Sequence, residues 1–446
     1  MVLLMKHPNM VPHLLIIVLL LAFISHEPEA IAQFLEPYPY TSQVAPLRKH
    51  ADAATPLYSI QMEIAIWVYI PAIYKNFIID IDAPFTWHDC TVDWNSWIYE
   101  SSNCFGCTHP TSCEEYACTD VRTSYSYESP SCLPITNSST LPGSGDCICP
   151  VNVVNPVNKT CGHALLNYDT FTFRASDGKN PFLDSYECNG NAACAPSSMF
   201  ESFPANVSGV MAFSSSRKAL PALLFQPFNN TFALCLPSSL SAHGVMFFGS
   251  GPYYLLPKSD VDLRSLLSYT PLLNHTNSFG YFIGIKSITV KGRSIDVSKS
   301  TTKLSTIDSY TILRADIYKQ VVRMFSVATL GILRARPVAP FAFCLKNRIG
   351  HSLSNLKMPD IVLKLQGGKK WRISSSNSMQ QVRKDVACLA FVNGGATSEY
   401  GIVIGTFQME NNFLLFDLDN STFGFSSSLL SHKTSCSNFN FTTLKH

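Results

Sequence analysis

The chain has few charged residues for its length. Lys, Arg, Asp and Glu together make up 14% of its 446 residues, against roughly 25% in an average soluble protein. The formal net charge is only +2, and no long run of Lys or Arg occurs. A nucleic-acid-binding surface needs clustered positive charge, so the composition argues against a nucleic-acid partner.

Long hydrophobic runs are also scarce. Lys6 and His7 precede an apolar stretch at 14–23, and Ala30-Ile-Ala32 offers small residues where a signal peptidase would cut. We therefore expect a secretory signal peptide at 1–32, with Gln33 as the first mature residue. The apolar stretch is too short to span a membrane and no later one is long enough. The sequence predicts a secreted, soluble protein of the extracellular space or cell wall, with no membrane partner.

Metal and cofactor motifs are weak. Fifteen cysteines follow the signal peptide, and ten of them lie between Cys90 and Cys188. Cys104-Phe-Gly-Cys107 and Cys147-Ile-Cys149 could be read as zinc ligands, but a second Cys/His pair at zinc-site spacing is missing. In an oxidising compartment a disulfide cluster is favoured, and the odd count leaves at least one cysteine unpaired. No metal or cofactor is predicted.

Sites for N-linked glycans, by contrast, are frequent. Asn-x-Ser/Thr sequons are expected to lie on the surface of a secreted chain, and several of them imply that some carry glycans. The candidates are Asn137, Asn158, Asn206, Asn229, Asn274, Asn420 and Asn440.

Short strands dominate the pattern from residue 56 onward. Residues 58–67 begin by alternating apolar and polar, and Asp177-Gly178 marks a hairpin turn. One helix is expected, over 315–327. We expect a nearly all-β chain in two lobes. Its parts are a short N-terminal segment (33–55), a first lobe (56–255) with a disulfide-rich insertion at about 90–161, a linker (256–277) and a second lobe (278–446).

Two similar segments carry the candidate chemistry. Phe77-Ile-Ile is an apolar run of strand length that ends at Asp80, and Asp308 lies in a comparable setting after Leu304. Two strands that each deliver one carboxylate could build a shared acid/base site, because close carboxylates can share one proton. The alternative is that an Asp at a strand end is ordinary turn chemistry.

Several spaced motifs give the chain a family resemblance, namely the segments 80–90, 304–318, 269–273, 281–285, 402–410 and 412–425. It resembles the plant branch of the pepsin-like (peptidase A1) family that contains extracellular dermal glycoprotein, basic 7S globulin and TAXI-type xylanase inhibitors. The resemblance covers almost the whole mature chain and implies two double-ψ β-barrel lobes around a central cleft.

The resemblance also implies that catalysis is impaired. Working members carry Asp-Thr/Ser-Gly-Ser/Thr in each lobe, and here Asp80 is followed by Ile81, Asp82 and Ala83. Asp82 replaces the glycine and adds a second negative charge beside Asp80, and Ala83 lacks a hydroxyl. In the second copy, aligned on Asp308, Tyr310 stands at the glycine position.

The loop that should cover the cleft is also incomplete. Active members carry a Tyr on a hairpin upstream of the segment that resembles 166–170, and no Tyr occurs between Tyr127 and Tyr168. Together with the changes around both aspartates, this absence predicts a site that is impaired or inactive.

The resemblance implies a different use for the C-terminal segment. TAXI-type inhibitors insert a His that precedes the final Cys into the cleft of a xylanase, and His432 lies four residues before Cys436. His432 and Lys433 are therefore candidate contacts to the two carboxylates of a glycoside hydrolase. An exposed His that is merely solvated is the alternative. The family spacing further implies the disulfides Cys344–Cys388 and Cys235–Cys436.

Three functional hypotheses follow. The favoured one is a proteinaceous inhibitor of cell-wall-degrading glycoside hydrolases of the xylanase or endoglucanase type. The second is an active aspartic-type endopeptidase that cuts peptide substrates at acidic pH. The third is a storage or binding role resembling that of basic 7S globulin.

Overall fold

A computed structural model describes residues 40–442, apart from a set of internal segments. Contacts divide the chain into Met1–Tyr40 and Thr41–His446, and the description below concerns the second unit. The predicted signal peptide, Asn137 and Asn229 lie outside the described residues. The internal segments that are not described are 52–55, 65–72, 93–106, 125–131, 133–138, 141–146, 225–229, 258–259, 277 and 347–357.

The fold has two lobes built mainly of β-strands, as predicted. The first lobe contains β1 (Ser42–His50), β2 (Leu57–Ile64), β3 (Ile73–Asp80), β4 (Thr86–His88), β5 (Thr91–Val92), β6 (Cys107–Pro110), α3 (Tyr116–Ser124), β7 (Ser139–Thr140), β8 (Cys147–Ile148), β9 (Pro150–Val154), β10 (Cys161–Ser176), β11 (Pro181–Cys194), β12 (Val207–Ala212), α4 (Leu220–Leu223), β13 (Thr231–Cys235) and β14 (Gly244–Phe248).

The second lobe begins near residue 268. Its elements are β15 (Ser268–Leu273), β16 (Phe282–Ile283), β17 (Ile285–Val290), β18 (Arg293–Asp296), β19 (Thr302–Leu304), β20 (Thr311–Leu313), α5 (Ala315–Ala328), β21 (Arg334–Ala335), β22 (Cys344–Lys346), β23 (Ile361–Leu365), β24 (Lys370–Ile373), α6 (Ser375–Ser378), β25 (Met379–Arg383), β26 (Val386–Leu389), β27 (Phe391–Asn393), β28 (Ile402–Ile404), α7 (Thr406–Met409), β29 (Phe413–Asp417) and β30 (Thr422–Phe425).

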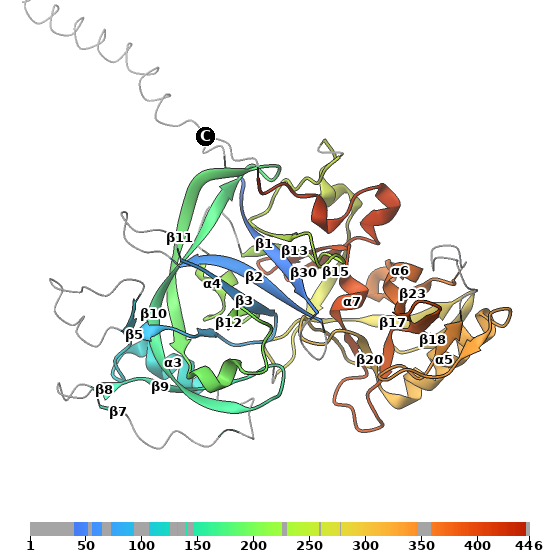
Figure 1. The fold of residues 1–446 in the computed structure, drawn as a ribbon, viewed down its shortest axis with the longest axis horizontal. Coiled ribbons are helices and arrows are strands. Elements are labelled where there is room, and N and C mark those ends of the chain that lie inside the picture. The colour runs from blue at the N-terminus through green and yellow to red at the C-terminus, as the bar shows by residue number, and fades with distance from the viewer. Residues whose placement is uncertain are drawn as a thin grey trace, which may run out of the picture. The chain divides into compact units, whose positions relative to one another are not determined.

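An antiparallel sheet joins the two halves of the chain. Its strands run in the order β1-β14-β13-β29-β30-β15, so strands from the start, the middle and the end of the sequence lie side by side (Figure 1). Phe232 of β13 stacks on Phe416 of β29, with ring centroids 4.6 Å apart. This shared sheet binds the first lobe to the second through buried aromatic packing.

In each lobe a short loop follows a strand that is paired with a neighbouring strand along both of its edges. In the first lobe, β3 pairs antiparallel with β2 and parallel with β12. In the second lobe, β19 pairs parallel with β28 and antiparallel with β16. Phe77, Ile78 and Ile79 of β3 are all buried, which explains why this strand is a continuous apolar run rather than an alternating one.

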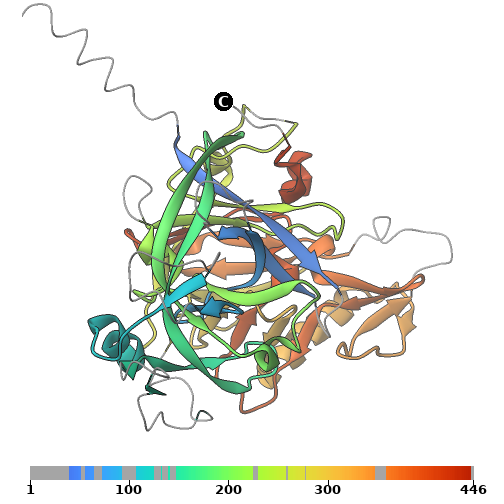
Figure 2. The same cartoon turned by 60° about the vertical axis from the view of Figure 1, so that its left-hand side comes forward.

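The expected elements are largely present, with one difference at the N-terminus and another in the predicted linker (256–277), where residues 268–273 form β15 and pair with β30. The helix predicted over 315–327 is α5, and Asp177-Gly178 forms the β10–β11 turn, with Gly178 at φ 81°. The β10–β11 hairpin is much longer than the predicted strands and arcs along the first lobe in Figures 1 and 2. Residues 42–50, predicted as part of a separate N-terminal segment, form β1 within the shared sheet.

Six disulfides are described. Cys235 pairs with Cys436 and Cys344 with Cys388, as the resemblance implies. Four more lie in or beside the insertion, namely Cys90–Cys194, Cys113–Cys147, Cys118–Cys149 and Cys132–Cys161. Cys188 is unpaired and buried. The side chains of Cys104 and Cys107 lie outside the described residues, so the zinc alternative for them stays open.

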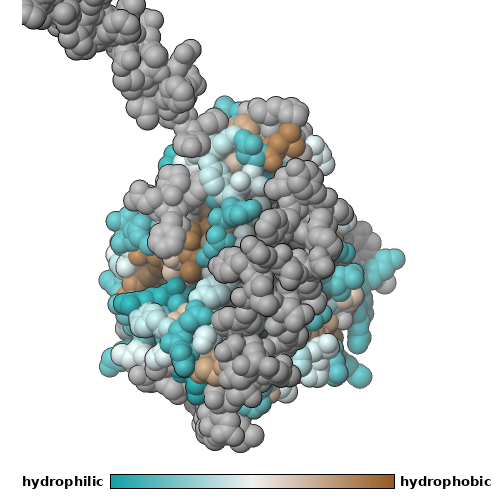
Figure 3. Space-filling model, turned by 90° about the vertical axis from the view of Figure 1, so that its left-hand side faces the viewer, coloured by the Kyte–Doolittle hydropathy of each residue, from teal (hydrophilic) through white to brown (hydrophobic). Residues whose placement is uncertain are grey.

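The surface of the first lobe is mixed in polarity. On the face drawn in Figure 3, hydrophilic side chains alternate with small apolar areas. In the part of the chain that the structure describes, no helix is long and apolar enough to cross a membrane. The same part contains no group of three or more His, Cys, Asp or Glu side chains that could hold a metal ion.

Candidate functional site

Asp80 is the last residue of β3 and is deeply buried, with 7% of its surface exposed. The apolar packing on both faces of β3 fixes the end of the strand at this point. The Asp80 carbonyl accepts a hydrogen bond from the Phe213 amide (2.8 Å), and the Asp82 amide donates to Asp80 Oδ1 (2.9 Å). These bonds fix the carboxyl group relative to its own loop.

Burial raises the pKa of the Asp80 carboxyl to about 6, and the nearby charge of Asp82 adds to that effect. The ammonium groups of Lys159 and Lys303 oppose the shift only in part. The neutral acid is therefore the main form of Asp80 below pH 6. A protonated carboxyl can donate a hydrogen bond, which an ordinary surface aspartate rarely does at that pH.

Asp82 reaches across to the second lobe. Its carboxylate forms an ion pair with Lys303 of β19 and accepts a hydrogen bond from Ser278 Oγ (2.8 Å). A Cβ added to Gly280 would lie 2.5 Å from Asp82 Oδ1, so a larger residue there would displace the Asp82 side chain. Asp82 adds a charge beside Asp80 but also joins the lobes. That Asp82 impairs catalysis stays a prediction.

The second loop begins with Ser305, directly after β19. The amides of Ile307 and Asp308 donate to Ser305 Oγ, at 3.2 Å and 3.0 Å. The bond from the Ile307 amide to the Ser305 side chain is equivalent to the bond from the Asp82 amide to the Asp80 side chain in the first loop. Leu304 pairs with Ile404 on the parallel strand β28, as Ile79 pairs with Met211 on β12.

A side chain of the second loop clasps the first loop. Thr306 Oγ1 donates to the Ile79 carbonyl (2.6 Å) and accepts from the Ile81 amide (3.2 Å). Thr306 thus bonds the residues on either side of Asp80. Since Ile81 follows Asp80 and Thr306 follows Ser305, the two loops meet at equivalent positions.

These contacts align Ser305, rather than Asp308, with Asp80. The motif comparison had aligned Asp308, which lies three residues further on. The Asp308 carbonyl accepts from the Thr406 amide (2.9 Å), and among the described residues nothing hydrogen-bonds its carboxylate. The physical reason for the difference is that β19 ends at Leu304, so the residue after the strand is the serine.

The alignment of Tyr310 with the motif changes for the same reason. With Ser305 aligned to Asp80, the glycine position of the second loop falls on Ile307. Ile307 packs, together with Ala83 of the first loop, against an apolar cluster of the first lobe. The Tyr310 ring instead packs against Phe341 and Phe407, with centroids 4.7 Å and 5.7 Å away. Tyr310 therefore does not crowd the turn as the motif comparison predicted.

The β9–β10 hairpin provides the segment next to this site. Its turn, residues 155–160, contains no Tyr, and its Lys159 is one of the two lysines whose charges lower the pKa of Asp80. Asn155 holds the turn by donating to the Met199 carbonyl (2.8 Å) and Ser202 Oγ (2.9 Å). This hairpin therefore contributes the positive charge of Lys159 near Asp80 and no Tyr that could cover the site.

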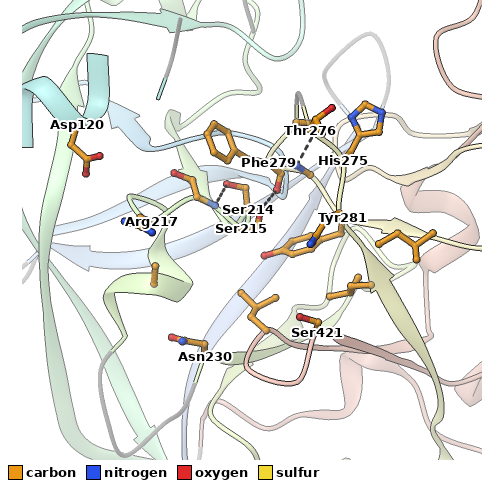
Figure 4. A pocket seen from close by; sticks show the side chains of 18 residues that line it. Asp120, Ser214, Ser215, Arg217, Asn230, His275, Thr276, Phe279, Tyr281 and Ser421 are labelled. Carbon is orange, nitrogen blue, oxygen red and sulfur yellow. Dashed lines mark hydrogen bonds between the residues drawn. The ribbon is translucent and has the colours of Figure 1, made fainter. Parts of the chain in front are cut away.

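A pocket of about 680 Å³, drawn in Figure 4, is lined in part by residues that hydrogen-bond to the first loop. Ser214 Oγ donates to the Ala83 carbonyl (2.7 Å), and Ser278 is the partner of Asp82. Figure 4 shows Asp120 and Arg217 at one end and His275 and Thr276 at the other. Hydroxyl and amide groups that come from distant parts of the sequence line this pocket, which sequence reasoning did not find.

His432 and Lys433 are both exposed. His432 ends a 3₁₀ helix (Leu429–His432), and Lys433 adopts the left-handed conformation at φ 58°. The Cys235–Cys436 disulfide and a hydrogen bond from Thr434 Oγ1 to the Leu256 carbonyl (2.5 Å) anchor the segment that follows. The segment is presented to solvent and held at its base.

The described sequons differ in their surroundings. Asn440 is half-buried, and four asparagines are exposed, namely Asn158, Asn206, Asn274 and Asn420. The Asn420 amide donates to Asp417 Oδ2 (2.8 Å). The sequons therefore differ in how readily they would accept a glycan.

Family models match both lobes. A model described as "Xylanase inhibitor N-terminal" matches residues 64–250, and one described as "Xylanase inhibitor C-terminal" matches residues 280–427. These matches cover more than half of the chain and divide it as the lobes do.

Named relatives span nearly the full length. "Chitinase CLP" of Oryza sativa subsp. japonica is 33% identical over 453 residues, covering 96% of this chain and 99% of the relative. "Probable aspartic proteinase GIP2" of Nicotiana benthamiana is 31% identical over 426 residues, covering 90% and 92%.

A solved structure agrees with the fold. The structure titled "Crystal structure of edgp" has a TM-score of 0.74 and 30% sequence identity, and covers 91% of this chain and 99% of its own. The similarity spans both lobes, as the two family models do. The chain belongs to the family of pepsin-like proteins of the plant xylanase-inhibitor type.

Proposed function

We propose that this protein is an extracellular inhibitor of glycoside hydrolases of the xylanase or endoglucanase type, and that it is not a peptidase. The observation that carries the proposal is the alignment of Asp80 with Ser305. Only one of the two equivalent loop positions carries a carboxylate. A cleft without a carboxylate pair is suited to a binding role that does not depend on peptide hydrolysis.

Peptide hydrolysis by this fold needs two carboxylates that share a proton. One accepts a proton from the attacking water while the other protonates the substrate. A serine hydroxyl titrates far outside the acidic range and cannot replace the second carboxyl group. The Asp82 carboxylate already forms an ion pair with Lys303 and accepts a hydrogen bond from Ser278. The peptidase alternative therefore lacks a proton-transfer partner for Asp80.

The C-terminal segment supports inhibition. A loop that enters another enzyme must be exposed and anchored, and His432 and Lys433 meet both conditions. Glycoside hydrolases carry two carboxyl groups about 5–10 Å apart. A protonated imidazole and an adjacent ammonium group complement such a pair, since charge-assisted hydrogen bonds are the stronger kind. Imidazoles are protonated in acidic solution, so binding should be tighter at low pH.

The test is inhibition of a xylanase and an endoglucanase at pH 5 and pH 7. We expect His432→Ala to raise the inhibition constant at least tenfold at pH 5, and by less at pH 7. Lys319→Ala, at an exposed position on α5, is the matched control and should change it less than twofold. Unchanged inhibition by His432→Ala would assign the activity to another surface. Absence of inhibition by the unaltered protein would overturn the proposed partner.

A second candidate is hydrolysis of a glycan. It is favoured by the raised pKa of Asp80, about 6, which suits a general acid, and by the name of the rice relative. It would also need a nearby carboxylate as nucleophile or base, for which Asp82 is the neighbour. Release of reducing ends from chitin oligosaccharides, abolished by Asp80→Asn, would support this candidate. No release at pH 4–6 would remove it.

A further inference from the structure

The turn of the β9–β10 hairpin contains the sequon Asn158-Lys159-Thr160. The Thr160 amide and Thr160 Oγ1 both donate to Asn158 Oδ1, at 3.0 Å and 2.7 Å. Asn158, Lys159 and Thr160 are all exposed. The side-chain oxygen of Asn158 is therefore fixed by its own turn, while the side chain stands at the surface.

The amide nitrogen of Asn158 is free to carry a substituent. Among the described residues, none accepts a hydrogen bond from Asn158 Nδ2, whereas Asn420 Nδ2 donates to Asp417 Oδ2. A sugar on Asn420 would compete with that bond. A sugar on Asn158 would leave both bonds to Oδ1 intact, so the folded turn accommodates it without rearrangement.

The hairpin packs against the same cluster as the two loops of the candidate site. Val151 and Val153 of β9 belong to the apolar cluster on which Ala83 and Ile307 rest. Asn155 ties the turn to residues 199–202 on the other side. The hairpin therefore packs on the same cluster as the loop that carries Asp80, and the charge of Lys159 acts on that carboxyl.

We propose that Asn158 carries an N-linked glycan, and that this carbohydrate covers the tip of the β9–β10 hairpin against approaching polypeptides. In the modification, Asn158 Nδ2 attacks the anomeric carbon of a lipid-pyrophosphate-linked oligosaccharide. A C–N bond forms, the lipid pyrophosphate leaves with the electron pair of the broken C–O bond, and Nδ2 loses one proton. The six disulfides are consistent with the oxidising secretory route in which this donor occurs. The proposal does not depend on the proposed inhibitory function.

The first test is site occupancy. The full chain is secreted from plant cells, and glycopeptides that contain Asn158 are quantified by mass spectrometry. We expect most of that peptide to carry a glycan, to lose it in Thr160→Ala, and to keep at least part of it in Thr160→Ser, which restores the sequon. An unmodified Asn158 in protein whose Asn206 or Asn274 is glycosylated would overturn the proposal.

The second test is access to the hairpin tip. Trypsin cleaves after lysine, and Lys159 adjoins the proposed glycan. We expect native trypsin cleavage after Lys159 to be at least tenfold slower in the secreted protein than in Asn158→Gln. Asn420→Gln, at a sequon on the β29–β30 turn, is the control and should leave the rate at Lys159 unchanged. Equal rates in the secreted protein and Asn158→Gln would show that the carbohydrate does not cover the tip.

Discussion

The two loops of the candidate site follow equivalent strands but carry different side chains at the equivalent positions. The first carries Asp80 and, after it, Ile81, while the second carries Ser305 and Thr306. One loop supplies the acid, and the other supplies the hydroxyl that holds both loops together. In this structure one hydroxyl group, that of Thr306, makes both bonds between the loops, and these bonds form without a second carboxylate.

The loops also differ in how charge is handled. The first loop has two carboxylates, of which Asp82 is paired with Lys303 and Asp80 is held toward its neutral form by burial. The second loop has Asp308, whose carboxylate is half-exposed and unpaired among the described residues. In the first loop the negative charge is therefore neutralised by an ion pair or by protonation, whereas the carboxylate of Asp308 depends on contact with solvent. This difference leads to three predictions that alter one loop at a time.

The largest effect is expected from Thr306→Val. The substitution keeps the shape of the side chain but leaves the Ile79 carbonyl and the Ile81 amide without their partner in a buried site. Leaving two such groups unsatisfied should lower the free energy of unfolding by about 4 kcal/mol. Thr306→Ser, which keeps the hydroxyl, is the control and should lose about 1 kcal/mol or less. Denaturant titration measures both, and an equal loss in the two variants would disprove the clasp.

The next effect is the contribution of Asp80 to stability as pH changes. Its pKa is about 6 in the folded protein and about 4 in the unfolded chain. Because the folded pKa is the higher one, this contribution is fully present below pH 4 and is lost as pH rises through 6. The difference corresponds to about 3 kcal/mol. Asp80→Asn should remove it.

The measurement is urea unfolding at pH 4 and pH 7. The contributions of the other titratable groups cancel when the unaltered protein is compared with Asp80→Asn. The unaltered protein should lose about 2 kcal/mol more than the variant between the two pH values, because part of the effect already lies below pH 4. The same pH dependence in both proteins would show that Asp80 is not the group responsible.

The smallest effect distinguishes the two roles of Asp82. Asp82→Asn should cost about 1 kcal/mol, because the ion pair with Lys303 is only partly buried. The same change should lower the pKa of Asp80, whereas Lys303→Met should raise it, since each removes one of the charges that act on Asp80. Carbon-13 NMR titration of the Asp80 carboxyl group follows both shifts. Shifts in the same direction would contradict the assigned charges.

The sequence predicted the parts of the fold that depend on local pattern. The apolar run before Asp80, the helix at 315–327 and the Asp177-Gly178 turn are visible as periodicity or turn chemistry, and each is present in the structure. The pairings Cys235–Cys436 and Cys344–Cys388 followed from the family resemblance. Apolar spacing and turn residues carry this information within a few positions of the chain.

The second loop was misaligned because an acidic residue was sought. Asp308 matched the residue type, but the strand ends at Leu304, and counting from that end would have selected Ser305. Lys303, Ser278 and Lys159 could not be predicted as neighbours of the first loop. Their interactions with that loop join residues more than 70 positions apart, and no local pattern encodes such interactions.

The most direct test of the account is digestion of casein by the purified, secreted protein between pH 3 and pH 6, with and without pepstatin. The unaltered protein, Asp80→Asn and Asp308→Asn are compared side by side. Because the position equivalent to Asp80 carries Ser305, we predict no pepstatin-sensitive cleavage by any of the three. Pepstatin-sensitive cleavage by the unaltered protein that both substitutions abolish would show that Asp80 and Asp308 form a working pair, and would contradict the account.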